Sequence, residues 1–493
     1  MLRNSRRNVV ADNLVRRVRE LRRDTPCEPS SPRHVERTGR RRVEPAGRQG
    51  GGGRLPPRPR PRDVASTALV TGLPRRRERW AVCGMRRFGV VRRDNPCMRF
   101  SVERDVLADA TGWAARYVPK PTAGAQQVLT GLLLEATMPT PDQDQAGDQA
   151  QAPGPALTVS AFDSEVAARA PVEAVVTEPG RVVVPGRLLA DVVRNLPDAP
   201  VVVEATETRV IIECGAARFR IPALAVEDYP VLPAFPPPVG EVDTLGFAAA
   251  VAQVAPAAGR DDALPVLTAV RLEIARGGLT MVATDRYRLA VRTIPWQPTV
   301  DDPDAVAHVP ARLLADVAKL PTTASRVMLG MGVDEAGVPR FGLSVNGRQT
   351  IVRLLEGSFP NYRRLLPETS ELTVTAPTAV LAAAVRRVAL VATRTAPLRF
   401  TFSAGQVVAE AGDGGGAQAS ELVPVEYDGP ELSVLFNPAF LLDGLAAVEG
   451  DEAIIGFATA DPEIASSKPA VLTGKDDGED YRYLLMPIRT GTA

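Results

Sequence analysis

The chain has 493 residues with 59 basic and 58 acidic side chains, so its formal net charge is only +1. This balance conceals two opposite parts. Residues 1–97 hold 26 Arg and 9 acidic residues, a balance of +17 (26 minus 9), and the remainder holds 33 basic and 49 acidic residues, a balance of −16 (33 minus 49). The absence of a long apolar run, a signal-peptide core and a C-x-x-C pair argues against a membrane span, a disulfide framework and a zinc site, and indicates a soluble, intracellular protein.

Residues 1–97 form an Arg-, Pro- and Gly-rich leader with clusters such as GGGRLPPRPRPR, and three interpretations of it are open. It could be a disordered arm that binds nucleic acid, because its positive charge attracts phosphates. It could be a targeting peptide, since Val10, Leu14, Val18 and Leu21 fall on one helical face among arginines. We favour the third interpretation, in which the leader is no part of the native protein and the chain starts at Met98.

From Met98 onward the sequence repeats itself. The segment VPGRLLADV at 184–192 returns as VPARLLADV at 309–317 with eight of nine positions identical, and more weakly as NPAFLLDGL at 437–445. Each copy follows one short β-rich run and precedes another. The period of about 125 residues exceeds the roughly 20 to 50 residues of solenoid units and suits a small domain. The sequence therefore predicts three copies of one domain.

Other elements keep the same order within the copies. The segment QVLTGLLLEA at 127–136 matches PVLTAVRLEI at 265–274, and both follow an Ala-rich stretch. Such stretches predict a first helix in each copy, at 106–117, 247–255 and 379–392. Alternation of apolar and polar residues, as at 209–221, predicts strands.

Proline accumulates between the copies, at 230–238 and 367–377, and marks their boundaries. We expect domain 1 at 98–236, domain 2 at 237–367 and domain 3 at 368–493. Each should consist of two helices packed on antiparallel sheets, which places the protein in the α+β class.

The sequence offers no catalytic motif: G-x-x-x-x-G-K-[ST], G-x-S-x-G, G-x-G-x-x-G and H-E-x-x-H are all missing. Asp163 and Asp285 recur in SAFDSE and VATDRY, which predicts a turn repeated in each domain and not a pair of catalytic carboxylates. His308 is expected to be an ordinary side chain, and the run Gly412–Gly416 predicts a hairpin tip. We therefore predict a protein that is not an enzyme and needs no cofactor or metal.

Four segments are distinctive: MRFSVERDVL at 98–107, ATDRYRLAV at 283–291, EGSFPNYRRLLP at 356–367 and YRYLLMPIR at 481–489. Together with the three-domain division, they resemble the β subunit of bacterial DNA polymerase III, the sliding clamp, in register from Met98 to Arg489. The resemblance implies that two three-domain subunits join head to tail in a ring-shaped homodimer, with sheets outside and helices lining a channel for duplex DNA. It does not extend to the leader.

The resemblance also implies three sets of functional residues. A cleft between domains 2 and 3 would hold a short peptide of each partner, at Leu267, Thr284, Tyr287, Arg288, Leu289, Pro360, Arg364, Leu365, Leu485, Met486, Pro487 and Ile488. Basic side chains would face DNA phosphates in the channel, at Lys120, Arg187, Arg194, Arg260, Arg312, Lys319, Arg386, Arg387 and Arg394. The dimer contact would join Phe219 and Ile221 to Leu390 and Val391. The family commonly has Gly-His where this chain has Arg286 and Tyr287, which predicts a change in partner preference.

The function that follows is a cytoplasmic DNA sliding clamp that encircles duplex DNA without reading its sequence and has no membrane partner. Its partners would be the replicative polymerase, the clamp loader, other proteins with a clamp-binding motif and a second copy of the chain. Tethering raises the effective concentration of the polymerase at the primer end, which gives processivity. One alternative is a clamp paralogue specialised for repair or resistance, which a Gln/Asp-rich insertion at 140–152 keeps open. A more distant one is an interaction scaffold that does not encircle DNA, which a stable monomer would favour.

Overall fold

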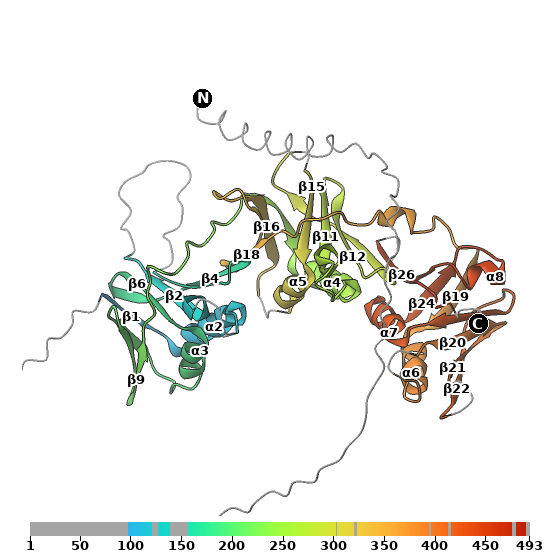
Figure 1. The fold of residues 1–493 in the computed structure, drawn as a ribbon, viewed down its shortest axis with the longest axis horizontal. Coiled ribbons are helices and arrows are strands. Elements are labelled where there is room, and N and C mark those ends of the chain that lie inside the picture. The colour runs from blue at the N-terminus through green and yellow to red at the C-terminus, as the bar shows by residue number, and fades with distance from the viewer. Residues whose placement is uncertain are drawn as a thin grey trace, which may run out of the picture. The chain divides into compact units, whose positions relative to one another are not determined.

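The computed structural model describes residues 97–120, 127–138, 156–301, 303–319, 323–393, 396–412, 416–475 and 480–489 (Figure 1). All of them lie in one compact unit of the chain. The predictions made for the leader before Cys97, for the insertion at 140–152 and for Arg394 lie outside the described residues.

The described residues form three domains, and the first two share one order of elements. Domain 1 contains β1 (Met98–Val102), α2 (Arg104–Ala114), the one-turn helices η1 (Ala115–Tyr117) and η2 (Gln127–Thr130), β2 (Gly131–Ala136), β3 (Leu157–Phe162), β4 (Val166–Val172), β5 (Val175–Glu178), β6 (Gly180–Pro185), α3 (Gly186–Arg194), β7 (Val201–Ala205), β8 (Arg209–Cys214) and β9 (Ala217–Pro222). The alternating segment at 209–221 is thus a hairpin of two strands.

Domain 2 repeats this order with β10 (Pro238–Asp243), α4 (Thr244–Val254), η3 (Ala255–Ala257), η4 (Pro265–Thr268), β11 (Ala269–Ala275), β12 (Gly278–Thr284), β13 (Arg288–Ile294), β14 (Gln297–Pro298), β15 (Asp304–Pro310), α5 (Ala311–Ala318), β16 (Arg326–Val333), β17 (Pro339–Val345) and β18 (Arg348–Arg353). The one-turn helix η5 (Tyr362–Arg364) lies in the linker that follows.

Domain 3 contains β19 (Leu372–Pro377), α6 (Thr378–Val388), β20 (Leu398–Ser403), β21 (Gln406–Ala411), β22 (Ala419–Pro424), β23 (Leu432–Phe436), α7 (Pro438–Ala447), β24 (Glu452–Phe457), α8 (Pro462–Ala465), β25 (Ala470–Gly474) and β26 (Tyr481–Leu485). The predicted glycine-rich hairpin tip connects β21 to β22, whose ends pair at Ala411 and Ala419. The predicted first helices and the repeated motif helices are confirmed as α2, α4, α6 and α3, α5, α7.

The two helices of each domain lie side by side: α2 with α3, α4 with α5 and α6 with α7 (Figure 1). The repeated motif explains this packing, because its apolar positions recur at helical spacing. Leu314 of α5 and Leu441 of α7 are buried in one core, while Arg312 of α5 is exposed. A polar side chain fixes the starts of α4 and α7: Asp243 accepts a hydrogen bond from the backbone of Gly246, and Asn437 from that of Ala439.

Among the described residues, the strands form four sheets, and two of these cross from one domain into the next. At the first junction, β18 of domain 2 pairs antiparallel with β4 of domain 1, with Val352 opposite Val166. At the second junction, β26 of domain 3 pairs antiparallel with β13 of domain 2, with Leu485 opposite Arg288. Backbone hydrogen bonds therefore join the domains in the same way as they join neighbouring strands within a domain.

The linker after domain 1 packs closely over the first junction. The ring of Phe235 lies so near to Gly330 and Gly342 that a Cβ atom there would come within 2.8 and 2.7 Å of it. A Cβ atom on Gly330 would also come within 2.6 Å of the carbonyl oxygen of Pro236. Glycine at these two positions of β16 and β17 is what lets the proline-rich linker lie against the strands.

Candidate functional site

Apolar side chains gather on one face of the sheet at the second junction. Leu289 of β13 lies opposite Leu484 of β26, and both belong to a buried cluster with Val282 and Tyr362. Met486 packs against this cluster, and its backbone N–H donates to the carbonyl of Tyr287 at 2.9 Å. We call this side of the sheet the cleft face. It brings together the hairpin of domain 2, the linker and the last strand of domain 3.

The hairpin between β12 and β13 is held by Asp285. Its Oδ1 accepts hydrogen bonds from the backbone N–H groups of Tyr287 and Arg288, each at 3.0 Å. Arg286, between Asp285 and Tyr287, has a φ of 80°, a left-handed conformation that costs a residue with a Cβ atom about 1 to 2 kcal/mol. A glycine would adopt this conformation without strain. Arg286 therefore replaces the glycine of the common Gly-His pattern at the residue of the turn whose backbone favours glycine.

The same turn occurs in domain 1. Asp163 accepts hydrogen bonds from the backbone of Glu165 and Val166. Ser164, which directly follows Asp163, has a φ of 78°. The prediction that Asp163 and Asp285 hold a repeated turn is therefore confirmed.

Arg288 is buried on the side of the sheet opposite the cleft face, with its side chain 5% exposed. Its Nε donates to Asp285 Oδ2 at 2.9 Å and its Nη1 to Asp443 Oδ2 of α7 at 2.6 Å. The guanidinium also lies over the ring of Phe440, 4.3 Å from its centre. Burial opposes the charge, but Tyr483, Asp443 and Asp285 outweigh it and raise the pKa of Arg288.

The linker between domains 2 and 3 is anchored on Glu273 of β11. This carboxylate accepts a hydrogen bond from the Tyr362 hydroxyl at 3.0 Å and forms ion pairs with Arg271 and Arg363. Burial alone would raise the pKa of Glu273, but the hydrogen bonds from the two arginines outweigh it, so the pKa lies below its ordinary value. Burial also raises the pKa of Tyr362 to about 12. Its hydrogen bond to Glu273 and its burial in the cluster fix Tyr362 in the floor of the cleft face.

His308, the one histidine in the described part of the chain, lies beside this linker. Its ring stacks on Phe359 with 5.7 Å between the ring centres, and its Nε2 is 3.2 Å from Arg271 Nη1. Burial and the nearby Arg271 charge lower the pKa of His308. These contacts pack His308 against the linker, which agrees with the expectation that it is an ordinary structural side chain.

The structure places the twelve predicted cleft residues in different ways. Leu289 and Met486 meet on the cleft face, and three predicted side chains near it are exposed: Tyr287 by 61%, Leu365 by 49% and Ile488 by 37%. Pro360 and Arg364 are exposed on the linker, and Thr284, Leu267 and Pro487 are buried. The Thr284 hydroxyl donates to the Arg288 carbonyl at 2.7 Å, which closes the hairpin.

Two of the predicted cleft residues, Arg288 and Leu485, have side chains on the side of the sheet opposite the cleft face. Successive side chains of a strand alternate between faces, and Arg288 and Leu485 are paired one residue away from Leu289 and Leu484. Leu485 belongs to the main core and Arg288 contacts α7. Leu484 and Tyr362 on the cleft face, and Asp443 on its other side, were not predicted from the sequence. Alternation in YRYLLMPIR could have revealed Leu484 if one facing residue had been known.

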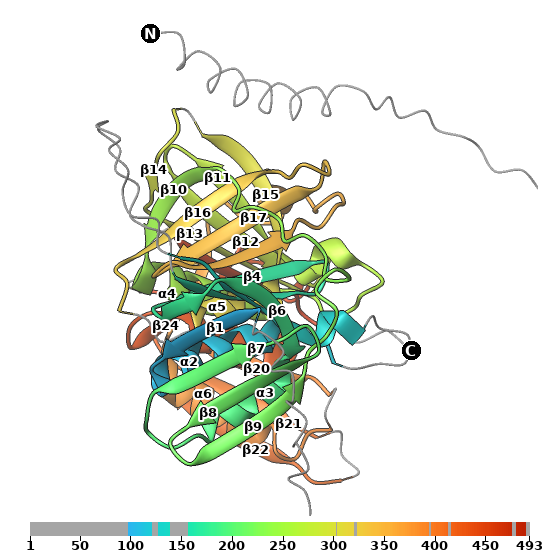
Figure 2. The same ribbon diagram turned by 90° about the vertical axis from the view of Figure 1, so that its left-hand side faces the viewer.

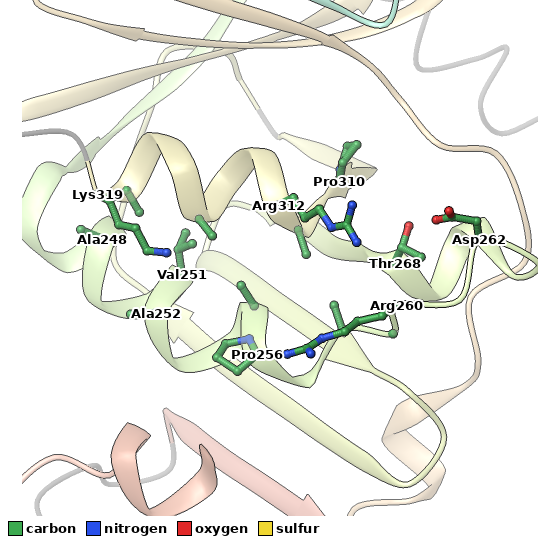
Figure 3. Close-up of a pocket in the computed structure, with 16 residues that line it drawn as sticks. Ala248, Val251, Ala252, Pro256, Arg260, Asp262, Thr268, Pro310, Arg312 and Lys319 are labelled. Carbon is green, nitrogen blue, oxygen red and sulfur yellow. The ribbon is translucent and has the colours of Figure 1, made fainter. Parts of the chain in front are cut away.

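Several predicted DNA-channel residues surround a groove of about 620 Å³ between α4 and α5 (Figure 3). Its floor consists mainly of small apolar residues such as Ala252 and Ala315. Arg260, Arg312 and Lys319 line it and are exposed, and none of the three has a carboxylate partner within the described part of the chain. Figure 3 shows Arg312 and Arg260 reaching toward this groove from opposite sides. The three basic side chains outnumber the one acidic side chain of the lining, Asp262, so the groove carries a positive balance.

The other predicted channel residues differ in their pairing. Arg194 pairs with Asp191 within α3, and Arg387 of α6 pairs with Glu421 of β22. Arg187 donates to the Val118 carbonyl at 3.3 Å. Arg386 and Lys120 are exposed.

Of the four predicted dimer residues, Phe219 and Leu390 are exposed, by 39% and 83%. Figure 2 shows β7, β8 and β9 side by side, and β9 is an edge strand of its sheet. Ile221 on this strand is 3% exposed and belongs to the domain 1 core, so its side chain is already covered. Val391 is half-buried against the core. A missed candidate is Leu422 of the edge strand β22, which is 53% exposed.

Within the described residues, no helix is long and apolar enough to cross a membrane. No group of three or more His, Cys, Asp or Glu side chains in the described ranges could hold a metal ion.

Comparison with known proteins agrees with the three-domain fold. Models of the N-terminal, central and C-terminal domains of the DNA polymerase III β subunit match residues 149–233, 241–361 and 363–489. The β sliding clamp of Streptomyces coelicolor is 45% identical over 394 residues, 80% of this chain and 99% of the relative. The β sliding clamp homologue GriR of Streptomyces muensis is 36% identical over 397 residues, again 80% and 99%. The crystal structure of the β subunit from Thermotoga maritima matches with a TM-score of 0.67 and 25% identity, over 80% of this chain and 100% of that one.

These matches define a three-domain processivity factor with no catalytic role of its own. The chain belongs to the β-subunit family of bacterial DNA polymerase III, the β sliding clamps. Its function is that of a DNA sliding clamp in replication.

Proposed function

We propose that the cleft face of the second junction is the site where this clamp holds its protein partners: the replicative polymerase, the clamp loader and other proteins with a clamp-binding motif. The observation that carries the proposal is the contact of Met486 with Tyr287 beside the cluster of Leu289 and Leu484. Exposed Leu365 on the linker offers apolar surface to a short peptide. Methionine suits a site with several partners because its side chain is flexible and polarizable.

The test is peptide titration of the preformed dimer after changing Met486 and Leu365 together to Ala. Each apolar anchor contributes roughly 1.5 to 3 kcal/mol on full burial, so the double change should remove up to about 3 to 6 kcal/mol of the affinity of about 8 kcal/mol of a micromolar peptide. Val231→Ala is a matched control, because Val231 is 92% exposed on the other linker. Unchanged binding by the double variant would place the cleft elsewhere.

The DNA channel is proposed to be lined by the basic residues of the helices, with the groove of Arg260, Arg312 and Lys319 as its most positive part. A ring holds DNA by topology, so phosphate contacts need only be weak and independent of sequence. Removing one phosphate contact should lower the slope of log affinity against log salt by about 0.9. We expect Arg312→Ala and Lys319→Ala to show this loss and Arg387→Ala, whose charge is paired with Glu421, to show less.

The internal junctions support a dimer contact between β9 of one subunit and β22 of the other. At each internal junction, the last strand of the later domain pairs with a strand of the earlier domain. That partner is the third strand after the first helix: β4 for β18, and β13 for β26. The unpaired strands at the corresponding places are β9 and β22. The same register places Phe219 opposite Ala419 and Arg218 opposite Ser420.

One further contact supports this dimer geometry. Thr350 of β18, which corresponds to Phe219 of β9, is close enough to Tyr117 in the turn after α2 to influence the pKa of its hydroxyl. The corresponding turn after α6 holds Leu390, so Phe219 should pack against it. Arg218→Cys and Ser420→Cys in one chain should give a covalent ring on mild oxidation. Neither single variant should do so, and failure of the double variant would reject this register.

The remaining proposals concern the ends of the functional chain and its place in the cell. We propose boundaries at 98–236, 237–367 and 368–493 for the three domains, and a cytoplasmic location. A chain starting at Met98 should form the same dimer with a comparable melting temperature. A role as a specialised paralogue is less well supported, because identity to the S. coelicolor clamp, 45%, exceeds that to GriR, 36%.

A further inference from the structure

We propose that Asp443 of α7 is a positioning residue for the partner cleft, which it shapes through Arg288 without touching the peptide. This inference rests on the proposed function of the cleft face. It assigns a specific role in partner binding to a side chain on the helix side of the sheet.

The geometry connects Asp443 to the hairpin that borders the cleft. Arg288 is the first residue of β13 and directly follows Tyr287. Its guanidinium joins Asp285, which holds the hairpin turn, to Asp443, which belongs to α7 of the next domain. Tyr483 of β26 lies within 3.4 Å of the same guanidinium and donates its own hydroxyl to the Phe440 carbonyl at 2.8 Å. The hairpin, the last strand and α7 thus meet at one buried charge.

A buried guanidinium needs carboxylate partners, because burial removes its hydration. Without Asp443, only Asp285 would remain as a charged partner, and Arg288 would gain by moving toward water. Such a shift would disturb the Asp285 turn, where Arg286 already holds a left-handed backbone. The Tyr287 carbonyl accepts the hydrogen bond of Met486, so the displacement would reach two residues of the cleft.

The first junction lacks this arrangement. The residue of β4 at the place of Arg288 is Val166, and the residue of β18 at the place of Tyr483 is Thr350, as the strand pairing shows. A buried charge at this position is therefore no requirement of joining two domains. It occurs at the junction where exposed apolar residues border the cleft face.

Changing Asp443 removes no contact with the peptide and leaves no buried cavity, because its side chain lies on the opposite side of the sheet and is 43% exposed. A matched control is Glu449, which is 47% exposed and pairs with Arg292 across the same two domains at 3.3 Å. Glu449 accepts no hydrogen bond from the hairpin residues 285–288. Asp443→Ala and Glu449→Ala thus each remove one interdomain ion pair, but only the first acts on Arg288.

The experiment measures binding of a fluorescent peptide from the cognate replicative polymerase to the full-length dimer. A lost hydrogen bond to a charged group should weaken the affinity of Asp443→Ala about tenfold, with most of the affinity recovered by Asp443→Glu. Amide hydrogen exchange should accelerate at Tyr287 and Met486, while the dimer mass stays the same. Glu449→Ala should bind like the parent.

Two results would overturn the inference: parental affinity of Asp443→Ala, or an equal loss in Asp443→Ala and Glu449→Ala, which would indicate general loosening of the domain contact. The Met486 and Leu365 double variant is measured in parallel. If the double variant loses binding while Asp443→Ala does not, the cleft assignment is supported and only the proposed role of Asp443 is wrong. If the double variant binds like the parent, the cleft assignment itself is wrong.

Discussion

At the first junction Ile351 of β18 lies opposite Ala167 of β4, and at the second Leu484 of β26 lies opposite Leu289 of β13. Both pairs belong to small buried clusters that also contain a linker tyrosine, Tyr229 in the first and Tyr362 in the second. Up to this point the two junctions are built alike.

They differ in what the linker does next. After Tyr229 the first linker continues through prolines and places Phe235 over the glycines of β16 and β17. The second linker makes the turn η5, which begins at Tyr362, and leaves the next residue, Leu365, exposed. Strand pairing therefore determines where two domains join, and the linker and a few side chains determine whether the junction offers a binding surface.

The largest expected effects come from the paired core residues. Ile351→Ala and Leu484→Ala each remove a fully buried side chain, 0% and 2% exposed, and should each cost about 2 to 5 kcal/mol of unfolding free energy. Only Leu484→Ala should also weaken peptide binding, because only that side chain lies in the cleft face. Denaturant unfolding and peptide titration of both variants measure this difference, and equal peptide affinities would mean that the junctions do not differ as we describe.

A smaller effect is expected where the first linker packs. Gly330→Ala would press its Cβ atom against Phe235 and the Pro236 carbonyl, and overpacking of this kind costs typically 1 to 3 kcal/mol. Gly277→Ala serves as the control, since nothing lies within 4 Å of a Cβ atom there. Thermal unfolding should separate the two variants, while both keep parental peptide affinity. Weaker peptide binding by Gly330→Ala would show that the first junction also influences the cleft.

Arg348, the interdomain arginine of the first junction, should contribute less to the free energy of unfolding than Arg288 does. Arg348 lies over Trp113, 5.5 Å from the ring centre, and pairs with Asp109, which is 67% exposed. Solvent screens such a pair, so Arg348→Ala should cost about 1 kcal/mol or less. A loss several times larger in denaturant unfolding would contradict the contrast between the two arginines.

The smallest effect should come from Glu273, which anchors the second linker and whose contribution to stability depends on pH. The pKa of Glu273 is depressed in the folded protein, so its contribution is complete above the unfolded value of about 4.3 and is lost as the pH falls through the folded pKa. Glu273→Gln should lower the melting temperature near neutral pH, and its difference from the parent should shrink below about pH 4.3. A constant difference down to strongly acidic pH would show that the charge of Glu273 does not support the linker.

Much of this architecture can be predicted from the sequence, because the repeated motif and its apolar spacing recur in all three domains. The turn of Asp163 and Asp285 is also predictable, since the two segments correspond. The cleft is only partly predictable. Leu484 and Leu485 are adjacent and equally apolar, and only the pairing with β13 shows which one faces the cleft. Asp443 could not be found, because it meets Arg288 across 155 positions of the chain.

The most direct test of the difference between the junctions is amide hydrogen exchange of the full-length dimer with and without a polymerase-derived peptide. Our account predicts slower exchange on peptide addition in segments 284–289 and 484–488, and unchanged exchange in segment 229–235 of the first linker. Protection of 229–235 without protection of 484–488 would contradict it and assign partner binding to the first junction.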